Sequence, residues 1–212
     1  MQGFRMDHEV WQLGHAVLFD LHLFQAALGR IAEPKEISAP QQEALSDSYL
    51  RFLSVLDNIP SHLVSPVVSP AGDPHSARLD TQARSFWVQG VNIVLTYHYL
   101  RMVILDRFIK AGLSHLLGIA DSRTSLAWKK VEIAHDVLTF MTGAPFEALQ
   151  VNGEPCVEKI RYVSATLLEV MQGDSGSVPV VIRARSHFSA LLDYLSRLNS
   201  RVSEKLAEIY QQ

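Results

Sequence analysis

Apolar residues recur every three or four positions along almost the whole of this 212-residue chain. Residues 7–29 show the pattern plainly, with apolar side chains at Val10, Leu13, Val17, Leu21, Phe24 and Leu28. This spacing gathers the apolar side chains on one face of an α-helix. The alternating pattern of a β-strand is absent, apart from a short ambiguous apolar run at residues 178–182. The sequence therefore predicts an all-α fold.

The periodic segments predict six helices, over residues 7–29, 42–57, 81–110, 125–141, 155–172 and 180–209. We expect the boundary residues to be Asp7 as a cap of the first helix, Gly29 and Gly112 as ends, and Asp121-Ser122 as the cap of the fourth helix. Apolar positions almost encircle the helix over 81–110, so we expect it to be buried and central.

Residues 60–80 contain Pro60, Pro66, Pro70 and Pro74 with Gly72 and several serines, which predicts a flexible surface loop. The apolar residues of the last helix recur with nearly a heptad spacing, at Phe188, Leu191, Leu195, Leu198, Val202, Leu206 and Ile209. This pattern is typical of a long helix that covers the core, and a homodimeric coiled coil is the alternative.

Composition favours one packed domain over residues 1–212. Hydrophobic residues make up 48 % and charged residues 19 % of the chain, so disorder over most of its length is excluded. No solenoid repeat divides it. We expect the following side chains to be mostly buried: Trp11, Val17, Phe24, Leu53, Leu95, Leu138, Leu167 and Leu195.

Charge and cysteine content argue against several classes of partner. The net charge is −3, so no global basic field holds nucleic acid, and we expect no direct DNA binding by this chain. The most apolar stretch, residues 91–105, is too short and too interrupted for a membrane span. The N-terminus does not read as a secretory signal. Cys156 is the single cysteine, which excludes an intramolecular disulfide and predicts a packed thiol in a reducing compartment, with a reactive thiol as the alternative.

Histidines raise the question of a metal site. His8, His15 and His22 repeat every seven residues, which places neighbours about 10 Å apart along a helix, too far to share one ion. The pair His135-Asp136 is similar to that of helical metal phosphohydrolases, with His98 and Asp193 as further ligands; this enzyme is the weakest alternative. We expect no metal, no cofactor and no enzymatic activity.

Asp20 lies on or beside the apolar stripe of the first helix. A carboxylate in such a position needs a partner, and Arg30, Arg101 or Arg107 could supply an ion pair. A ligand contact is the alternative.

Two segments carry motifs that are more specific than apolar spacing. The first runs from Trp11 to Arg30 and includes Leu18-Phe19-Asp20 and Leu28-Gly29-Arg30. The second includes Tyr97-His98-Tyr99-Leu100-Arg101 and Arg107-Phe108. Both segments resemble the fungal-specific transcription factor domain, the middle homology region that accompanies a six-cysteine zinc cluster. Residues 131–141 and the Glu158–Leu168 segment follow in the order expected. The matching positions, with structural or regulatory roles, are Trp11, Asp20, Gly29, Arg30, Tyr97, Tyr99, Arg101 and Arg107.

The resemblance implies a regulatory domain that acts in the nucleus and controls transcription by RNA polymerase II through a small-molecule effector or protein partners. With one cysteine the zinc cluster is not in this chain, so we expect it to begin inside the regulatory region, as a fragment or a truncated relative. The alternative is a stand-alone helical interaction protein that pairs with a related regulator, as a homodimer or a heterodimer.

Overall fold

The computed structural model describes residues 2–29, 39–64, 76–173 and 177–210, and the side chains of residues 3–26, 39–64, 81–173 and 177–199. These residues form helices and no strand, which confirms the all-α fold. The α-helices are α1 Gln2–Gly29, α2 Ala39–Leu53, α3 Ser61–Val64, α4 Ser76–Ala111, α5 Arg123–Gly143, α6 Phe146–Val151, α7 Gly153–Gln172 and α8 Val178–Tyr210, with short 3-10 helices at Ser54–Leu56 and Ser114–Leu117.

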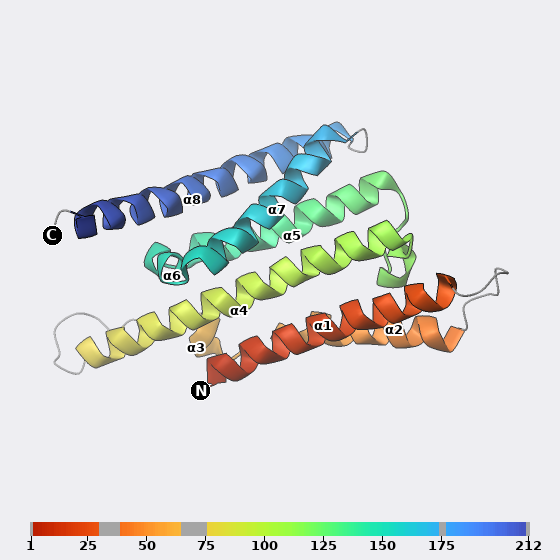
Figure 1. The fold of residues 1–212 in the computed structure, drawn as a ribbon, viewed down its shortest axis with the longest axis horizontal. Coiled ribbons are helices and arrows are strands. Elements are labelled where there is room, and N and C mark those ends of the chain that lie inside the picture. The colour runs from red at the N-terminus through yellow and green to blue at the C-terminus, as the bar shows by residue number, and fades with distance from the viewer. Residues whose placement is uncertain (1, 30–38, 65–75, 174–176, 211–212) are drawn as a thin grey trace.

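The long helix α4 runs through the middle of the molecule, with α1, α2 and α3 on one side and α5, α7 and α8 on the other (Figure 1). Two stripes of apolar residues on opposite faces of α4 explain this central position. Val91, Leu95, Met102 and Leu105 face one cluster of buried side chains. Ile93, Tyr97, Leu100, Ile104 and Phe108 face the other. The predicted central helix is therefore confirmed.

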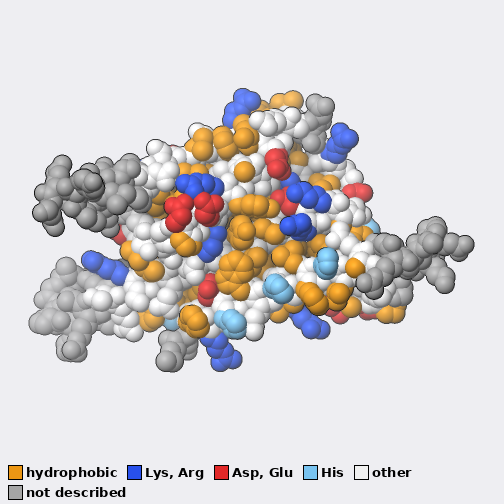
Figure 2. Space-filling view, viewed as in Figure 1, with side chains coloured by type: hydrophobic (Ala, Val, Ile, Leu, Met, Phe, Trp, Pro, Cys, Tyr) orange, Lys and Arg blue, Asp and Glu red, His pale blue; other side chains and the backbone are white. Residues whose placement is uncertain are grey.

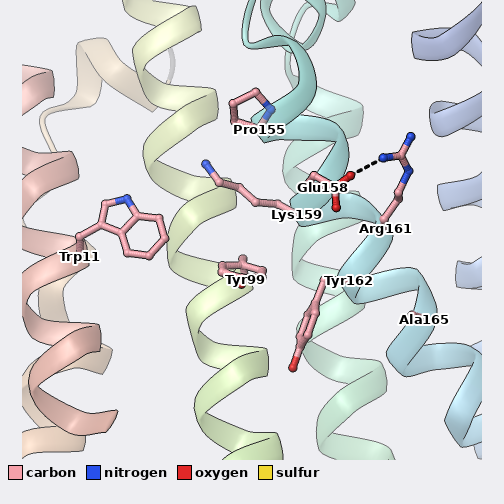
Figure 3. Close-up of a pocket in the computed structure, with 8 residues that line it drawn as sticks. All are labelled: Trp11, Tyr99, Pro155, Glu158, Lys159, Arg161, Tyr162 and Ala165. Atoms are coloured by element: carbon pink, nitrogen blue, oxygen red, sulfur yellow. Dashed lines mark hydrogen bonds and ion pairs between the residues drawn. The ribbon is translucent and has the colours of Figure 1, made fainter. Parts of the chain in front are cut away.

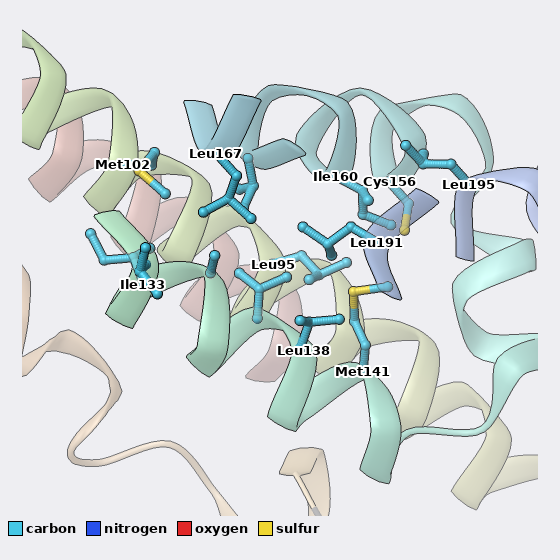
Figure 4. Close-up of a cluster of buried hydrophobic side chains, with 14 of the residues drawn as sticks. Leu95, Met102, Ile133, Leu138, Met141, Cys156, Ile160, Leu167, Leu191 and Leu195 are labelled. Atoms are coloured by element: carbon cyan, nitrogen blue, oxygen red, sulfur yellow. The ribbon is translucent and has the colours of Figure 1, made fainter. Parts of the chain in front are cut away.

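The larger cluster joins α4 to α5, α6, α7 and α8, and Figure 4 shows its side chains meeting between these helices. Leu138, Leu167 and Leu191 lie within it. The smaller cluster joins α4 to α1, α2 and α3 through residues such as Val17 and Phe52. Both clusters share α4, so the described helices pack as one domain.

Several helix ends lie where the sequence predicts them. Gly29 is the last residue of α1, and Gly112, with φ of 70°, follows the last residue of α4. The Ser122 hydroxyl accepts a hydrogen bond from the Ser125 backbone N–H at 3.1 Å and so caps α5. The predicted Asp7 cap is wrong. Helix α1 already begins at Gln2, and the Asp7 carboxylate accepts a hydrogen bond from Asn92 of α4 instead.

The predicted loop over residues 60–80 is partly wrong. Residues 61–64 form α3, and α4 already begins at Ser76. Pro60 precedes α3, and its carbonyl accepts a hydrogen bond from the Leu63 N–H at 2.9 Å. Proline fits just before or in the first turn of a helix, where no intrahelical N–H bond is lost, so proline there did not mean a loop. Residues 65–75 lie outside the described part. The ambiguous run at 178–182 forms the first turns of α8.

Six of the eight side chains predicted to be mostly buried belong to the buried core: Val17, Phe24, Leu95, Leu138, Leu167 and Leu195. Leu53 is partly exposed and packs against the smaller cluster. The prediction for Trp11 is wrong, because its side chain is 43 % exposed. Val10 occupies the buried face of α1. Consecutive side chains of an α-helix point about 100° apart, so Trp11, which follows Val10, lies at the edge of the contact with α4.

In the last helix, Leu191, Leu195 and Leu198 are buried against the larger cluster, as expected for a helix that caps the core. The side chains of Val202, Leu206 and Ile209 lie outside the described part, so the coiled-coil alternative is untested. Among the described helices none has the length and apolar character needed to cross a membrane.

Candidate functional site

A groove of about 450 Å³ opens between α1, α4 and α7. Figure 2 shows hydrophobic side chains gathered in the middle of this face, with charged side chains to the left and right of them. Figure 3 shows the lining residues in place, from three helices that are far apart in the sequence. The groove is lined by Trp11, Tyr99, Pro155, Glu158, Lys159, Arg161, Tyr162 and Ala165.

Aromatic rings form the walls of the groove. Trp11 of α1 stands on one side, and the rings of Tyr99 and Tyr162 meet edge to face with their centroids 5.2 Å apart. The Tyr162 hydroxyl donates a hydrogen bond to Asp106 Oδ2 at 3.0 Å. Burial, followed by the nearby Asp106 carboxylate, raises the pKa of Tyr162. This side chain is therefore held in one orientation as a neutral phenol.

Lys159 places a positive charge beside these rings. Its ammonium donates hydrogen bonds to Asn92 Oδ1 at 2.8 Å and Thr96 Oγ1 at 2.7 Å. The Asn92 amide in turn donates to Asp7 Oδ1 at 3.0 Å. Burial lowers the pKa of Lys159 and raises the pKa of Asp7. The ion pairs among the described residues do not include Lys159, so its direct partners are neutral oxygens.

The second cation of the groove, Arg161, lies at the rim. Its guanidinium donates to the Glu154 carboxylate at 2.7 Å and also to Glu158. Because two carboxylates share this exposed guanidinium, Arg161 brings no free positive charge to the groove. Lys159 is the cation that remains for a ligand.

The structure brings together two of the residues matched by resemblance, Trp11 and Tyr99, in this groove. Tyr97 and Arg101 point elsewhere. The Tyr97 hydroxyl donates to the Leu53 carbonyl at 2.9 Å, and the Arg101 guanidinium pairs with Asp136 of α5 at 2.7 Å.

The other matched positions lie apart from the groove. Arg107 is exposed, Gly29 ends α1, and Arg30 lies outside the described part. Asp20 is half-buried. Of the three arginines considered as its ion-pair partner, Arg30 lies outside the described part. The ion pairs of the described side chains join Asp20 to neither Arg101 nor Arg107, and Arg101 pairs with Asp136 instead. Asp136 lies on α5, one of the helices that pack against α4.

The residues considered as metal ligands do not converge. Asp136 binds Arg101, Arg101 also donates to His98 Nδ1 at 3.0 Å, and Asp193 lies 4.0 Å from Arg197 on α8. His135 stacks on His187 with ring centroids 5.3 Å apart. His8, His15 and His22 are all exposed. Within the described side chains, no group of three His, Cys, Asp or Glu residues is placed to hold a metal ion.

Sequence reasoning missed the roles of Lys159 and Tyr162. One signal was present, because Lys159 lies on the apolar side of its helix, three residues after Cys156 and four before Val163, both of which are buried. A lysine at such a position has to direct its ammonium along the helix surface to a polar partner. That partner lies on α4, which the pattern of α7 alone does not reveal.

Comparison with known proteins adds no relative: no family model, no curated protein and no solved structure matches this chain.

Proposed function

We propose that this chain is the regulatory region of a fungal transcription factor, which acts in the nucleus and controls genes transcribed by RNA polymerase II. It works by binding an effector or a partner protein in the groove between α1, α4 and α7. One observation carries the proposal. Trp11 and Tyr99 come from the two separate segments that resemble the middle homology region, and both line the same groove.

The pairing of the charged groups between the helices supports a binding role rather than catalysis. Asp106 is held by Lys130 and Tyr162, and Asp136 is held by Arg101. A catalytic acid or base has to be free to exchange protons with a substrate. These groups instead join α4 to α5 and α7.

The groove could regulate the protein because its walls belong to three different helices. A ligand that contacts Trp11 of α1 and Lys159 of α7 favours the arrangement of helices in which both contacts form. The ratio of the ligand's affinities for two arrangements of these helices determines how far binding shifts the population from one arrangement to the other. The Asp7–Asn92–Lys159 series of hydrogen bonds already links α1, α4 and α7 at the same place. Ligand binding there would therefore change how firmly α1 is held.

A reporter assay tests this proposal. Residues 1–212 are fused to a heterologous DNA-binding module in a fungal host, and transcription from a promoter that carries its operators is measured. We expect the fused chain to change transcription relative to the module alone. Trp11→Ala and Tyr99→Ala should reduce that change, because each removes one wall of the groove.

Trp128→Ala is the matched control, since Trp128 on α5 is also 43 % exposed but lies outside the groove. It should leave the reporter signal as in the wild type. A fused chain that behaves like the module alone, or groove variants that behave like Trp128→Ala, would contradict the proposal. Immunoblotting establishes equal amounts of each fusion.

A helical interaction protein is the second candidate, favoured by one face of α1. The exposed side chains Phe4, His8, Trp11, His15, Phe19, His22 and Leu23 follow a three-to-four spacing along this helix. None of these side chains is a Lys, Arg, Asp or Glu, so they could meet a second copy without contact between like charges; the exposed Arg5 lies at the edge of this face. This candidate predicts a dimer of two copies that Phe19→Ser with Leu23→Ser converts to a monomer, measured by light scattering. Ile182→Ser, an exposed apolar site on α8, is the control.

A further inference from the structure

We propose that the groove between α1, α4 and α7 binds a small aromatic monocarboxylic acid. The ring of the acid lies against Trp11 and the two tyrosines, and its carboxylate pairs with Lys159. This inference names the ligand class of the regulatory groove and so rests on the proposed function for its biological meaning. The binding itself follows from the chemistry of the lining.

The walls suit a flat, apolar body. Trp11, Tyr99 and Tyr162 present aromatic surfaces from three helices, and Pro155 and Ala165 add further apolar lining beside the charged Glu158, Lys159 and Arg161. Aromatic rings pack favourably against one another in stacked or edge-to-face arrangements, as Tyr99 and Tyr162 already do. The volume of about 450 Å³ lies in the range of small-molecule sites, which is about 300–1,000 Å³.

Lys159 selects for a negative charge. An ammonium has three N–H donors, and Asn92 and Thr96 accept two of these hydrogen bonds. The third donor is left for a ligand. Both present acceptors are neutral, so a bound carboxylate would give this half-buried cation an ion pair that it lacks among the described residues. In Figure 3 the Lys159 nitrogen lies on the side of the groove that faces Trp11. A ring beside Trp11 therefore places its carboxylate within reach.

The remaining charges select a monoanion over a phosphate. Arg161 is held by Glu154 and Glu158, and Asp7 lies behind Asn92 near the Lys159 ammonium. Phosphate groups are bound best by several donors at once, often by a bidentate arginine. Here one donor of one lysine is available, and the nearby carboxylates repel a second negative charge.

Calorimetric titration of residues 1–212 at neutral pH tests the proposal. The probes are indole-3-acetate, phenylacetate and 1-naphthaleneacetate, with indole-3-acetamide as the uncharged counterpart and phenyl phosphate as the dianion. We expect at least one of the acids to bind, and indole-3-acetate to bind about tenfold or more tightly than its amide, because only the acid forms a charge-assisted bond to Lys159. Phenyl phosphate should bind more weakly than phenylacetate.

Variants identify the contacts. Lys159→Gln should bring the acid and the amide to similar affinities, whereas Trp11→Ala should weaken both. Trp128→Ala, the matched tryptophan outside the groove, should bind as the wild type does. Circular dichroism checks that each variant is folded. If Lys159→Gln does not fold, the acid-to-amide ratio of the wild type and the effect of Trp11→Ala decide the question.

The proposal is overturned if no acid binds at concentrations up to about 1 mM, if acid and amide bind equally, or if Trp11→Ala has no effect. Such a failure is distinct from failure of the proposed function. Groove variants that still alter reporter transcription would then mean a different occupant, whereas acid binding without any reporter effect would mean a site that does not regulate transcription.

Discussion

The ammonium of Lys130 on α5 lies 2.6 Å from the Asp106 carboxylate on α4, and both side chains are largely buried. The other carboxylate oxygen of Asp106 accepts the hydrogen bond from Tyr162 of α7. One carboxylate thus joins three helices directly behind the tyrosine wall of the groove. The orientation of Tyr162 depends on this carboxylate.

Asp106→Asn should lower the free energy of unfolding by about 2 kcal/mol, because it removes the closer and buried carboxylate of Lys130 and leaves only the exposed Glu169 carboxylate, at 3.6 Å, beside this ammonium. Denaturation by urea, followed by circular dichroism, measures the change. Asp193→Asn is the control, since Asp193 and Arg197 form an exposed contact at 4.0 Å, and it should cost less than about 1 kcal/mol. Equal losses in the two variants would contradict this account.

Gly90→Ala should also destabilise the protein. A Cβ atom at Gly90 would lie 1.7 Å from the Leu63 carbonyl oxygen, so α3 and α4 could not keep their close contact. We expect a loss of at least about 2 kcal/mol in the free energy of unfolding. Gly143→Ala, at the end of α5, meets nothing within 4 Å and should be neutral or stabilising by up to about 1 kcal/mol. A tolerated Gly90→Ala would show that α3 does not pack on α4 in solution.

His98 should make stability fall as the solution becomes acidic. Burial, followed by the Arg101 cation, lowers the pKa of His98 from 6.5 to about 4, while Asp136 opposes this change. The Arg101 guanidinium can only donate hydrogen bonds, so its bond to His98 Nδ1 requires the lone pair of a neutral imidazole. Above pH 6.5 the ring is neutral in both the folded and unfolded states. Between pH 6.5 and 4 only the unfolded chain binds the proton, so stability falls by about 3 kcal/mol.

The measurement is the difference in unfolding free energy between wild type and His98→Gln at several pH values from 7 to 4. Glutamine can still accept from Arg101 but does not titrate, so the variant should lose less stability on acidification. His187, whose pKa is also lowered by burial, is present in both proteins and cancels in the difference. Parallel pH profiles would contradict the assignment.

Cys156 should resist thiol reagents in the folded protein. The side chain is buried, and burial raises the pKa of the thiol to about 11. Compared with the ordinary value of 9.0, this lowers the thiolate fraction about a hundredfold at neutral pH. Ellman's reagent should therefore react slowly with native protein and fast in guanidinium. Because the chain has one cysteine, the released chromophore reports this site alone. Rapid reaction of the native protein would mean that α7 opens locally.

Residues 1–212 should bind neither stoichiometric zinc nor a specific DNA sequence. Three of the more closely spaced cations are engaged within the chain: Lys129 pairs with Glu132, Lys130 with Asp106, and Arg183 lies over the Trp128 ring. Metal analysis after dialysis against zinc, and titration with genomic DNA fragments at about 150 mM salt, test this. One tightly held zinc per chain, or a fragment preferred about a hundredfold over bulk DNA, would contradict it.

Much of the fold could be predicted because helices depend on residues that are close together in the sequence. The spacing of apolar residues depends only on the helical repeat, and Gly29, Gly112 and Ser122 act on their own helix ends. The central place of α4 was also predictable. A helix with apolar residues on two faces has to be covered on both.

The groove was not predictable in the same way, because it depends on how helices from distant parts of the chain pack. The apolar spacing alone places Trp11 and Lys159 on amphipathic helices. The packing of the helices puts Trp11 at the edge of the contact with α4, and it brings Lys159 of α7 to Asn92 and Thr96. The same packing makes Asp136 the partner of Arg101. The helical repeat specifies direction around one axis, whereas a site between three helices needs the relative positions and rotations of all three, which only the packed core defines.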